Sequence, residues 1–209
     1  MYRRILVSAA AVVWFSFCSS LMAQQDFSAE IVDHQHGADS TPAKVYVTKD
    51  RMRIEGMGQS GHNGTVILNF STRTTTVLIP ERQMYMEMQS GQGPTAQRSW
   101  AYFRALDVED ACPEWRKMSA KPNAECHKVG SETVNGRSTV KYEGKSSSGE
   151  VNDVWLDSKI AFPIKWQGKE GGGELQNIKE GPQSAGLFEI PAGYQKMTLP
   201  MGMPSMPQH

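Results

Sequence analysis

The chain has 209 residues with 22 basic and 22 acidic side chains, and therefore carries no formal net charge. Because no stretch concentrates lysine and arginine, the sequence lacks the electrostatic footprint of a nucleic-acid-binding protein. A chain of this length can bury a sizeable core as one domain, which we expect over residues 24–197.

The first residues have the pattern of a secretory signal peptide over residues 1–23. Arg3 and Arg4 precede an apolar run at residues 5–17, and the small residue Ala23 suits cleavage before Gln24. The apolar run is too short to span a membrane comfortably. We therefore expect a periplasmic or secreted protein without a transmembrane segment once the signal peptide is cleaved.

Alternating apolar and polar side chains, interrupted at intervals by turn-forming residues, dominate the rest of the chain. This period of two favours a meandering antiparallel sheet. In the first half of the chain, strands are predicted at residues 27–32, 43–48, 51–57, 65–70, 74–79 and 84–88.

The period changes after the glycine-containing linker at residues 90–94. Trp100, Phe103, Leu106 and Val108 have the spacing of one face of an amphipathic helix, which we predict over residues 96–110. This segment is the clearest helix signal in the sequence, and we expect it to cover the sheet as a lid.

A second meander is predicted in the rest of the chain. Asn135 and Gly136 lie between two alternating runs, and a type I′ hairpin turn needs positive φ at both central positions. Strands are expected at residues 129–134, 137–143, 151–156, 164–167 and 174–179, with a last edge segment at 187–191. The tail at residues 198–209 is rich in methionine and proline and is predicted to be disordered.

Cys112 and Cys126 are predicted to form a structural disulfide. An oxidising compartment would allow them to pair, which would close a loop of 15 residues and contribute about 3 kcal/mol by the chain-entropy estimate. Their spacing differs from the C-x-x-C pattern of redox sites, and a zinc site lacks recognisable further ligands.

The sequence shows no convincing catalytic or cofactor signature, so we expect a protein that is not an enzyme and has no cofactor. The segment at residues 58–62 resembles a serine-hydrolase elbow only superficially, because its second glycine comes one residue too early. His34, His36 and His209 are candidate metal ligands, and the thioethers of Met197, Met201, Met203 and Met206 could favour copper. Because no third protein ligand of recognisable spacing accompanies His34 and His36, we predict no metal site.

Methionines grouped on predicted strand faces are the more informative feature. Their soft, unbranched side chains adapt to varied apolar partners, which suits a cavity for acyl chains or hydrophobic segments, although an ordinary core would have the same pattern. The predicted cavity lining consists of Met52, Ile54, Leu68, Phe70, Met84, Met86, Met88, Trp100, Phe103 and Trp155.

Several stretches resemble secreted bacterial proteins of an uncharacterised family that looks similar to the periplasmic lipoprotein-carrier (LolA/LolB-like) superfamily. They are Arg51-Met52-Arg53-Ile54-Glu55, the run from Gly130 to Gly136, Val154-Trp155-Leu156-Asp157 with Phe162-Pro163-Ile164-Lys165, and the run from Leu187 to Tyr194. The resemblance implies a curved sheet forming an incomplete barrel with a helical lid over a hydrophobic cavity. The cysteine loop and the methionine- and proline-rich tail depart from that pattern.

Together these observations predict a mainly β (α+β) fold and an extracytoplasmic binding or carrier protein for a hydrophobic ligand, either a lipid or a lipidated protein. Two alternatives remain. The chain could be a structural or sensory interaction module of the bacterial envelope with a filled core and an envelope protein partner. It could also be a metal-binding envelope protein that uses His34, His36 and the tail.

Overall fold

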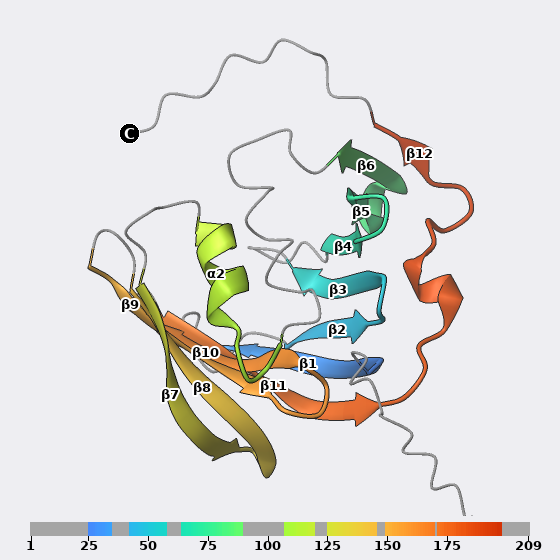
Figure 1. Cartoon of the computed structure of the whole chain (residues 1–209). Coiled ribbons are helices and arrows are strands. Elements are labelled where there is room, and N and C mark those ends of the chain that lie inside the picture. The colour runs from blue at the N-terminus through green and yellow to red at the C-terminus, as the bar shows by residue number, and fades with distance from the viewer. Residues whose placement is uncertain are drawn as a thin grey trace, which may run out of the picture.

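The strands assemble into one strongly curved sheet (Figure 1). The structure, a computed structural model, describes residues 25–34, 42–57, 64–89, 107–119, 125–145, 149–169 and 171–197. The signal peptide and tail predicted from the sequence lie outside these residues. Within them the strand order is β12-β6-β5-β4-β3-β2-β1-β11-β10-β9-β8-β7, and the edge strands β7 and β12 do not pair, so the sheet stays open.

The first half of the sheet is a meander of six strands. Each begins and ends within one residue of the predicted bounds, because alternation is strong there and turn residues separate the runs. The elements are β1 (Phe27–Asp33), β2 (Ala43–Val47), β3 (Arg51–Met57), β4 (Gly64–Asn69), β5 (Thr74–Ile79), the 3₁₀ turn η1 (Pro80–Arg82) and β6 (Met84–Gln89).

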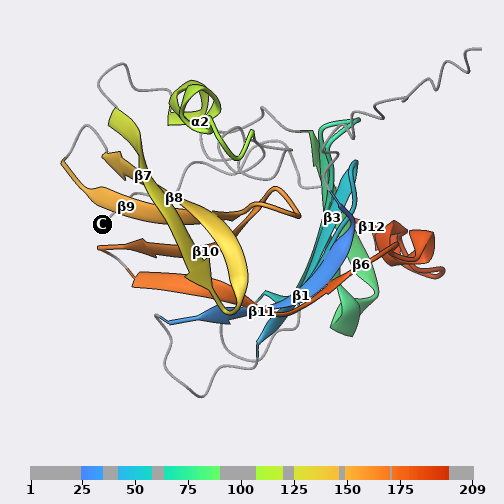
Figure 2. The ribbon, with the colours of Figure 1, turned by 60° about the horizontal axis from the view of Figure 1, so that its bottom comes forward.

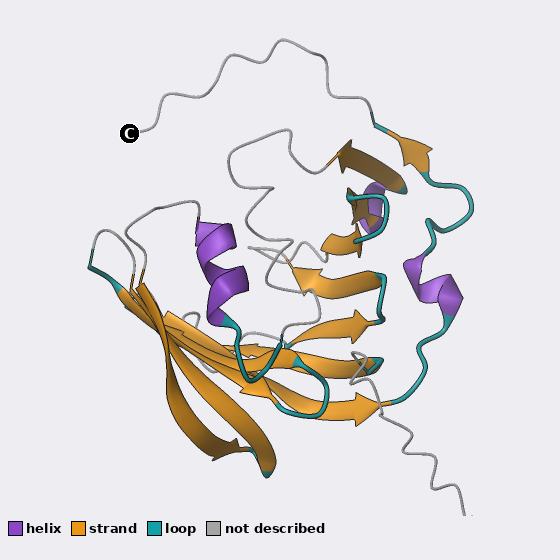
Figure 3. Cartoon of the chain, viewed as in Figure 1, coloured by secondary structure: helices purple, strands orange, loops and turns teal. Residues whose placement is uncertain are grey.

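The second half is a meander of five strands that follows the helix. The predicted Asn135-Gly136 hairpin is confirmed, with φ of 50° and 76° at the two residues. The elements are α2 (Cys112–Ser119), β7 (Glu125–Val134), β8 (Arg137–Lys145), β9 (Val151–Asp157), β10 (Phe162–Gly168) and β11 (Gly171–Glu180). Strands dominate the secondary structure throughout (Figure 3).

The described helix differs from the prediction. Residue 107 has no regular structure and residues 108–110 form bends, the rest of the predicted span 96–110 lies outside the described residues, and α2 begins at Cys112. Pro113 occupies the first turn, where its missing N–H has no helical partner to lose, and Glu114 supplies the negative charge favoured there. These start signals account for the helix at Cys112, and of the predicted span only residues 107–110 are shown not to be helical.

The predicted edge segment at residues 187–191 is not a strand. Residues 185–188 form a 3₁₀ turn, η3 (Ala185–Phe188), and the last strand is β12 (Gln195–Lys196), which pairs with β6 in parallel. Phe188 is buried and packs with Ile67 and Leu78. Burial of this side chain on the sheet, together with the pairing of β12 with β6, sets the path of residues 182–197, which we call the strap.

Each strand of the first meander divides its side chains between two faces. The inner face, on the concave side that α2 covers, carries Phe27, Val47, Met52 and Leu68, which are paired successively across β1, β2, β3 and β4. The outer face is covered by the strap (Figures 1 and 2). Because both faces are covered near β4, its neighbouring residues Ile67 and Leu68 are both buried although they point to opposite faces.

Helix α2 is attached to the second meander at several points. The Cys112–Cys126 disulfide, confirmed with a Cα–Cα distance of 5.5 Å, joins its first turn to β7. The Tyr142 hydroxyl donates a hydrogen bond to the Val108 carbonyl (2.9 Å) and accepts one from the Ala111 N–H (3.3 Å). Trp115 packs so closely on Gly144 that a Cβ there would lie 2.6 Å from its ring.

A charged network fastens the ends of three strands. Asp157 is 1% exposed, pairs with Arg137, and accepts hydrogen bonds from the N–H groups of Lys159 (2.8 Å) and Ile160 (2.9 Å). Arg137 also bonds to Glu180 (2.8 Å), which pairs with Lys159 (2.5 Å). Because the buried carboxylate has several donors, its burial is compensated.

Removing the disulfide should destabilise the fold. We expect the Cys112→Ala/Cys126→Ala variant to lose about 3 kcal/mol of unfolding free energy, because its unfolded chain regains the entropy of a 15-residue loop. Urea denaturation monitored by tryptophan fluorescence measures the change, and the wild-type protein under a thiol reductant is the control. Equal midpoints for the oxidised protein and the variant would contradict this role.

The network should make stability depend on pH. The Lys159 ammonium and the Arg137 guanidinium lower the pKa of Glu180. A lowered pKa in the folded state stabilises the protein above the ordinary carboxyl value of about 4.3, and the contribution is lost as the pH falls through the folded pKa. We therefore expect Glu180→Gln to be less stable than wild type at pH 7 and to converge with it as the pH falls below the folded-state pKa of Glu180. The matched control is Glu125→Gln, at an exposed residue, and a constant difference across this range in urea titrations would disprove the linkage.

Candidate ligand-binding face

Aligned apolar side chains run across the inner face from β3 to β6. Ile54 lies opposite Val66, Val66 opposite Val77, and Val77 opposite Met86. Directly opposed residues of antiparallel strands place their side chains on the same face, so these four form one row. All four are only partly buried, which distinguishes this part of the face from the core beside it.

A neighbouring row shows how exposure rises towards β6. Met52 is fully buried and Leu68 is 7% exposed, whereas Met88, at the β6 end of the row beyond Thr75, is 42% exposed. The core therefore continues into an apolar surface that the described residues cover incompletely. An incompletely covered apolar surface of this kind marks a binding site more often than an isolated exposed side chain does.

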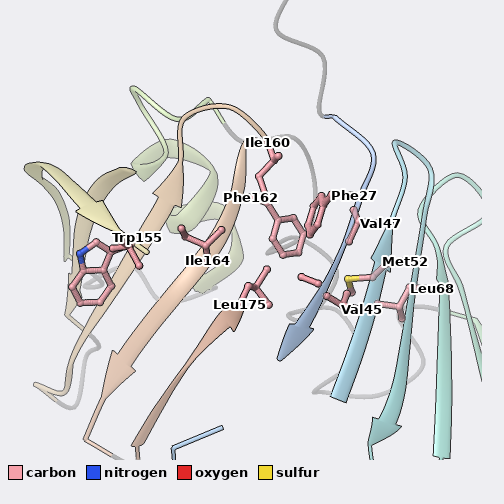
Figure 4. Packing of buried hydrophobic residues seen from close by; sticks show 12 residues of the cluster. Phe27, Val45, Val47, Met52, Leu68, Trp155, Ile160, Phe162, Ile164 and Leu175 are labelled. Atoms are coloured by element: carbon pink, nitrogen blue, oxygen red, sulfur yellow. The ribbon is translucent and has the colours of Figure 1, made fainter. Parts of the chain in front are cut away.

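The predicted lining residues fall into three groups. Met52, Leu68 and Trp155 belong to one buried cluster, and Ile54 and Phe70 pack against it. Figure 4 shows Trp155 at one end of this cluster and Met52 and Leu68 at the other.

The methionines of β6 form the second group. Met84, Met86 and Met88 alternate along the strand and therefore share the face of Val77. They lie at the exposed end of the aligned rows. Trp100 and Phe103 form the third group and lie outside the described residues.

Trp155 is already engaged by protein groups. Its indole N–H donates to a Glu132 carboxylate oxygen (2.7 Å), and the Lys141 and Lys165 ammonium groups each lie 4.8 Å from the ring centroid. The hydrogen bond of Lys141 to Asp153 raises the pKa of that lysine and keeps it charged over the ring. These contacts leave the partly exposed side chains of β5 and β6 as the better candidates for contact with a ligand.

Val66, Val77 and Ile79 extend the face but were not among the predicted lining residues. Their strands alternate clearly, yet Thr74–Ile79 is β-branched at nearly every position, so the sequence alone does not say which side faces inwards. Opposed residues of a hairpin have their side chains on the same face. Pairing β5 with the methionine-rich β6 would therefore have placed Val77 and Ile79 on the face of the β6 methionines.

The metal hypothesis gains no support from the described chain. His34 follows β1 as an exposed residue, and its backbone N–H donates to the Gly172 carbonyl (2.9 Å). His36 and His209 lie outside the described residues. Within those residues, no group of three or more His, Cys, Asp or Glu side chains is placed to hold a metal ion.

Among the residues that the structure describes, no helix is long and apolar enough to cross a bilayer.

Comparisons with known proteins concern the fold. No protein-family model matches the chain, and no curated protein matches it. An uncharacterized conserved protein from Thermus thermophilus superimposes with a TM-score of 0.53 at 10% sequence identity, over 83% of this chain and 90% of that one. This likeness shows that the two chains share a fold.

Two further solved structures are similar at lower scores. MucB in the Pseudomonas aeruginosa MucA/MucB complex gives a TM-score of 0.49 at 14% identity, over 88% of this chain and 62% of MucB, so this chain spans less than two thirds of that protein. A LolA superfamily protein from Nitrosomonas europaea gives 0.33 at 10% identity, over 79% of this chain and 90% of the other.

Proposed function

We propose that this chain is a non-enzymatic binding or carrier protein for a hydrophobic ligand, and that it acts outside the cytoplasm. The observation that supports the proposal is the inner face of β3–β6, where burial falls from Met52 to Met88 while the side chains stay apolar. The apolar character of the row therefore continues beyond the part that the core of the described residues buries.

Desolvation would supply the binding energy. Each methylene group of an acyl chain that leaves water contributes about 0.8 kcal/mol, so ten of them contribute about 8 kcal/mol before the cost of association. Methionine side chains at the contact adapt to chains of different shape. This mode of binding needs no nucleophile, general base or cofactor, in keeping with the chemistry of the face.

The arrangement of α2 suggests where the ligand lies. The helix packs over Val140, Tyr142 and Leu156 on the second meander, whereas the partly exposed rows lie on the first. A ligand on β5 and β6 would therefore lie on the same concave side as the helix but beside its packed face. A lipid, or the lipid of a modified protein, fits this position, and an apolar segment of an envelope protein is the second candidate.

A charge placed on the face should abolish ligand binding. We expect Met86→Glu to bind a fluorescent long-chain fatty acid at least about tenfold more weakly than wild type, because an ionised carboxylate loses solvation beneath an acyl chain. Val129→Glu is the matched control, because Val129 is 51% exposed on β7, away from the aligned rows.

Native mass spectrometry of the protein purified from a bacterial envelope completes this test. Co-purified lipid in the wild type and the control, but not in Met86→Glu, would support a lipid carrier. If no variant binds lipid or fatty acid, the lipid proposal fails, and the envelope-protein segment becomes the candidate to test.

Export is tested separately. The full chain is expressed in a Gram-negative host, and the intact mass of the protein in the periplasmic fraction is measured. We expect this mass to match a chain that begins at Gln24, because Ala23 ends the signal peptide pattern. Replacing Ala23 with a bulky residue should slow processing. An uncleaved chain confined to the cytoplasm would overturn this part of the proposal.

A further inference from the structure

A second concave feature lies on the outer face of the sheet, between β3 and the strap. Its volume is about 500 Å³, and its lining includes Arg53, Leu187, Glu189, Ile190, Pro191 and Ala192. Because Arg53 points away from the inner face that carries Met52 and Ile54, this depression is separate from the proposed lipid-binding face.

Arg53 is held in a fixed orientation at one side of the depression. Its Nε–H donates to Glu55 (2.7 Å), and Nη1 donates to the Leu187 carbonyl oxygen (2.8 Å). A guanidinium group has five N–H donors, and these two bonds use only part of that set. The side chain is 15% exposed, so the remaining donors adjoin a partly desolvated space.

The opposite wall is apolar and is fixed by the strap. Ile190 is 36% exposed, and Pro191 and Ala192 follow it along the same lining. Burial of Phe188 and the hydrogen bond from the Glu189 N–H to the Gly186 carbonyl (3.3 Å) hold the turn in place. Guanidinium N–H donors that face these apolar side chains can bind a hydrogen-bond acceptor that carries an apolar group.

We propose that this depression binds a monocarboxylate attached to a short apolar chain. The carboxylate accepts hydrogen bonds from Arg53, and the chain packs on Ile190 and Pro191. Because Glu55 and Glu189 offset the charge of Arg53, the N–H donors of the guanidinium rather than a net positive charge hold this one carboxylate, and a second carboxylate on the ligand is disfavoured. This chemistry occurs in free short-chain acids and in the C-terminus of a peptide that ends in an apolar residue.

Nuclear magnetic resonance on the ¹⁵N-labelled full mature protein tests the site. The probes are sodium butanoate, N-acetyl-Ala-Ala-Val with a free carboxylate, and the same peptide as its C-terminal amide. We expect the Arg53 Nε–H signal and the amides of residues 184–192 to shift with butanoate or the peptide acid. The peptide amide and sodium succinate should bind at least about fivefold more weakly, because one lacks the anion and the other adds a charge.

The two carboxylates distinguish the source of the ligand. A stronger response to the peptide acid indicates a peptide C-terminus, and a stronger response to butanoate indicates a free acid. Equal responses to the peptide acid and its amide, or no response to either carboxylate, would refute the site.

Two variants separate binding from folding. Arg53→Lys removes the planar fork and should weaken carboxylate binding about tenfold, but it also removes a contact that holds the strap. Ala192→Leu fills the depression and leaves both hydrogen bonds of Arg53 in place, so it should block binding while keeping the wild-type unfolding midpoint. Unchanged carboxylate binding in Ala192→Leu would overturn the proposal. Met86→Glu should bind these carboxylates as the wild-type protein does. The proposal for lipid binding at the inner face and the proposal for carboxylate binding in the depression can therefore fail independently.

Discussion

The pairing of β1 with β11 is the constraint on which the structure depends, because it joins the two meanders into one sheet. Ile31 lies opposite Leu175, and the Gly181 N–H donates to the Asp26 carbonyl (2.8 Å) beyond the end of the ladder. Phe27 adds an edge-to-face contact with Phe162, with ring centroids 5.1 Å apart. Without this pairing the inner faces of the two meanders would not form one continuous apolar surface, and the cluster that joins them would be divided between two sheets.

The different coverings of the two faces follow from this single curved sheet. The concave side receives α2, fixed by the disulfide and by Tyr142, while the convex side of the first meander receives the strap. Each covering buries apolar side chains over only part of its face. Both candidate sites lie where such a covering ends. They are the apolar surface at β5 and β6 and the depression beside Arg53, and each includes apolar side chains that are partly exposed.

Local features of the sequence predicted more of this fold than its long-range features. Alternation located the strands, Asn135-Gly136 located a hairpin, and the two cysteines located the disulfide, because each depends on residues close together in the chain. The β1–β11 pairing joins residues more than a hundred positions apart and has no local signal. Residues 187–191 were misassigned for the same reason, since Phe188 takes its conformation from the outer face on which it packs.

Strand β3 shows the same contrast between local features, which the sequence predicts, and long-range features, which it does not. Arg51-Met52-Arg53-Ile54-Glu55 carried part of the family resemblance, and its alternation correctly separated Met52 and Ile54 from the charged residues. The pattern could not reveal that burial declines across the β4, β5 and β6 partners of Met52, because exposure depends on what packs above a face. Nor could it reveal that Arg53 meets the strap 134 residues further along the chain. One strand therefore contributes to an apolar face on one side and to the depression beside Arg53 on the other, and the positions of the coverings decide how far each surface is exposed.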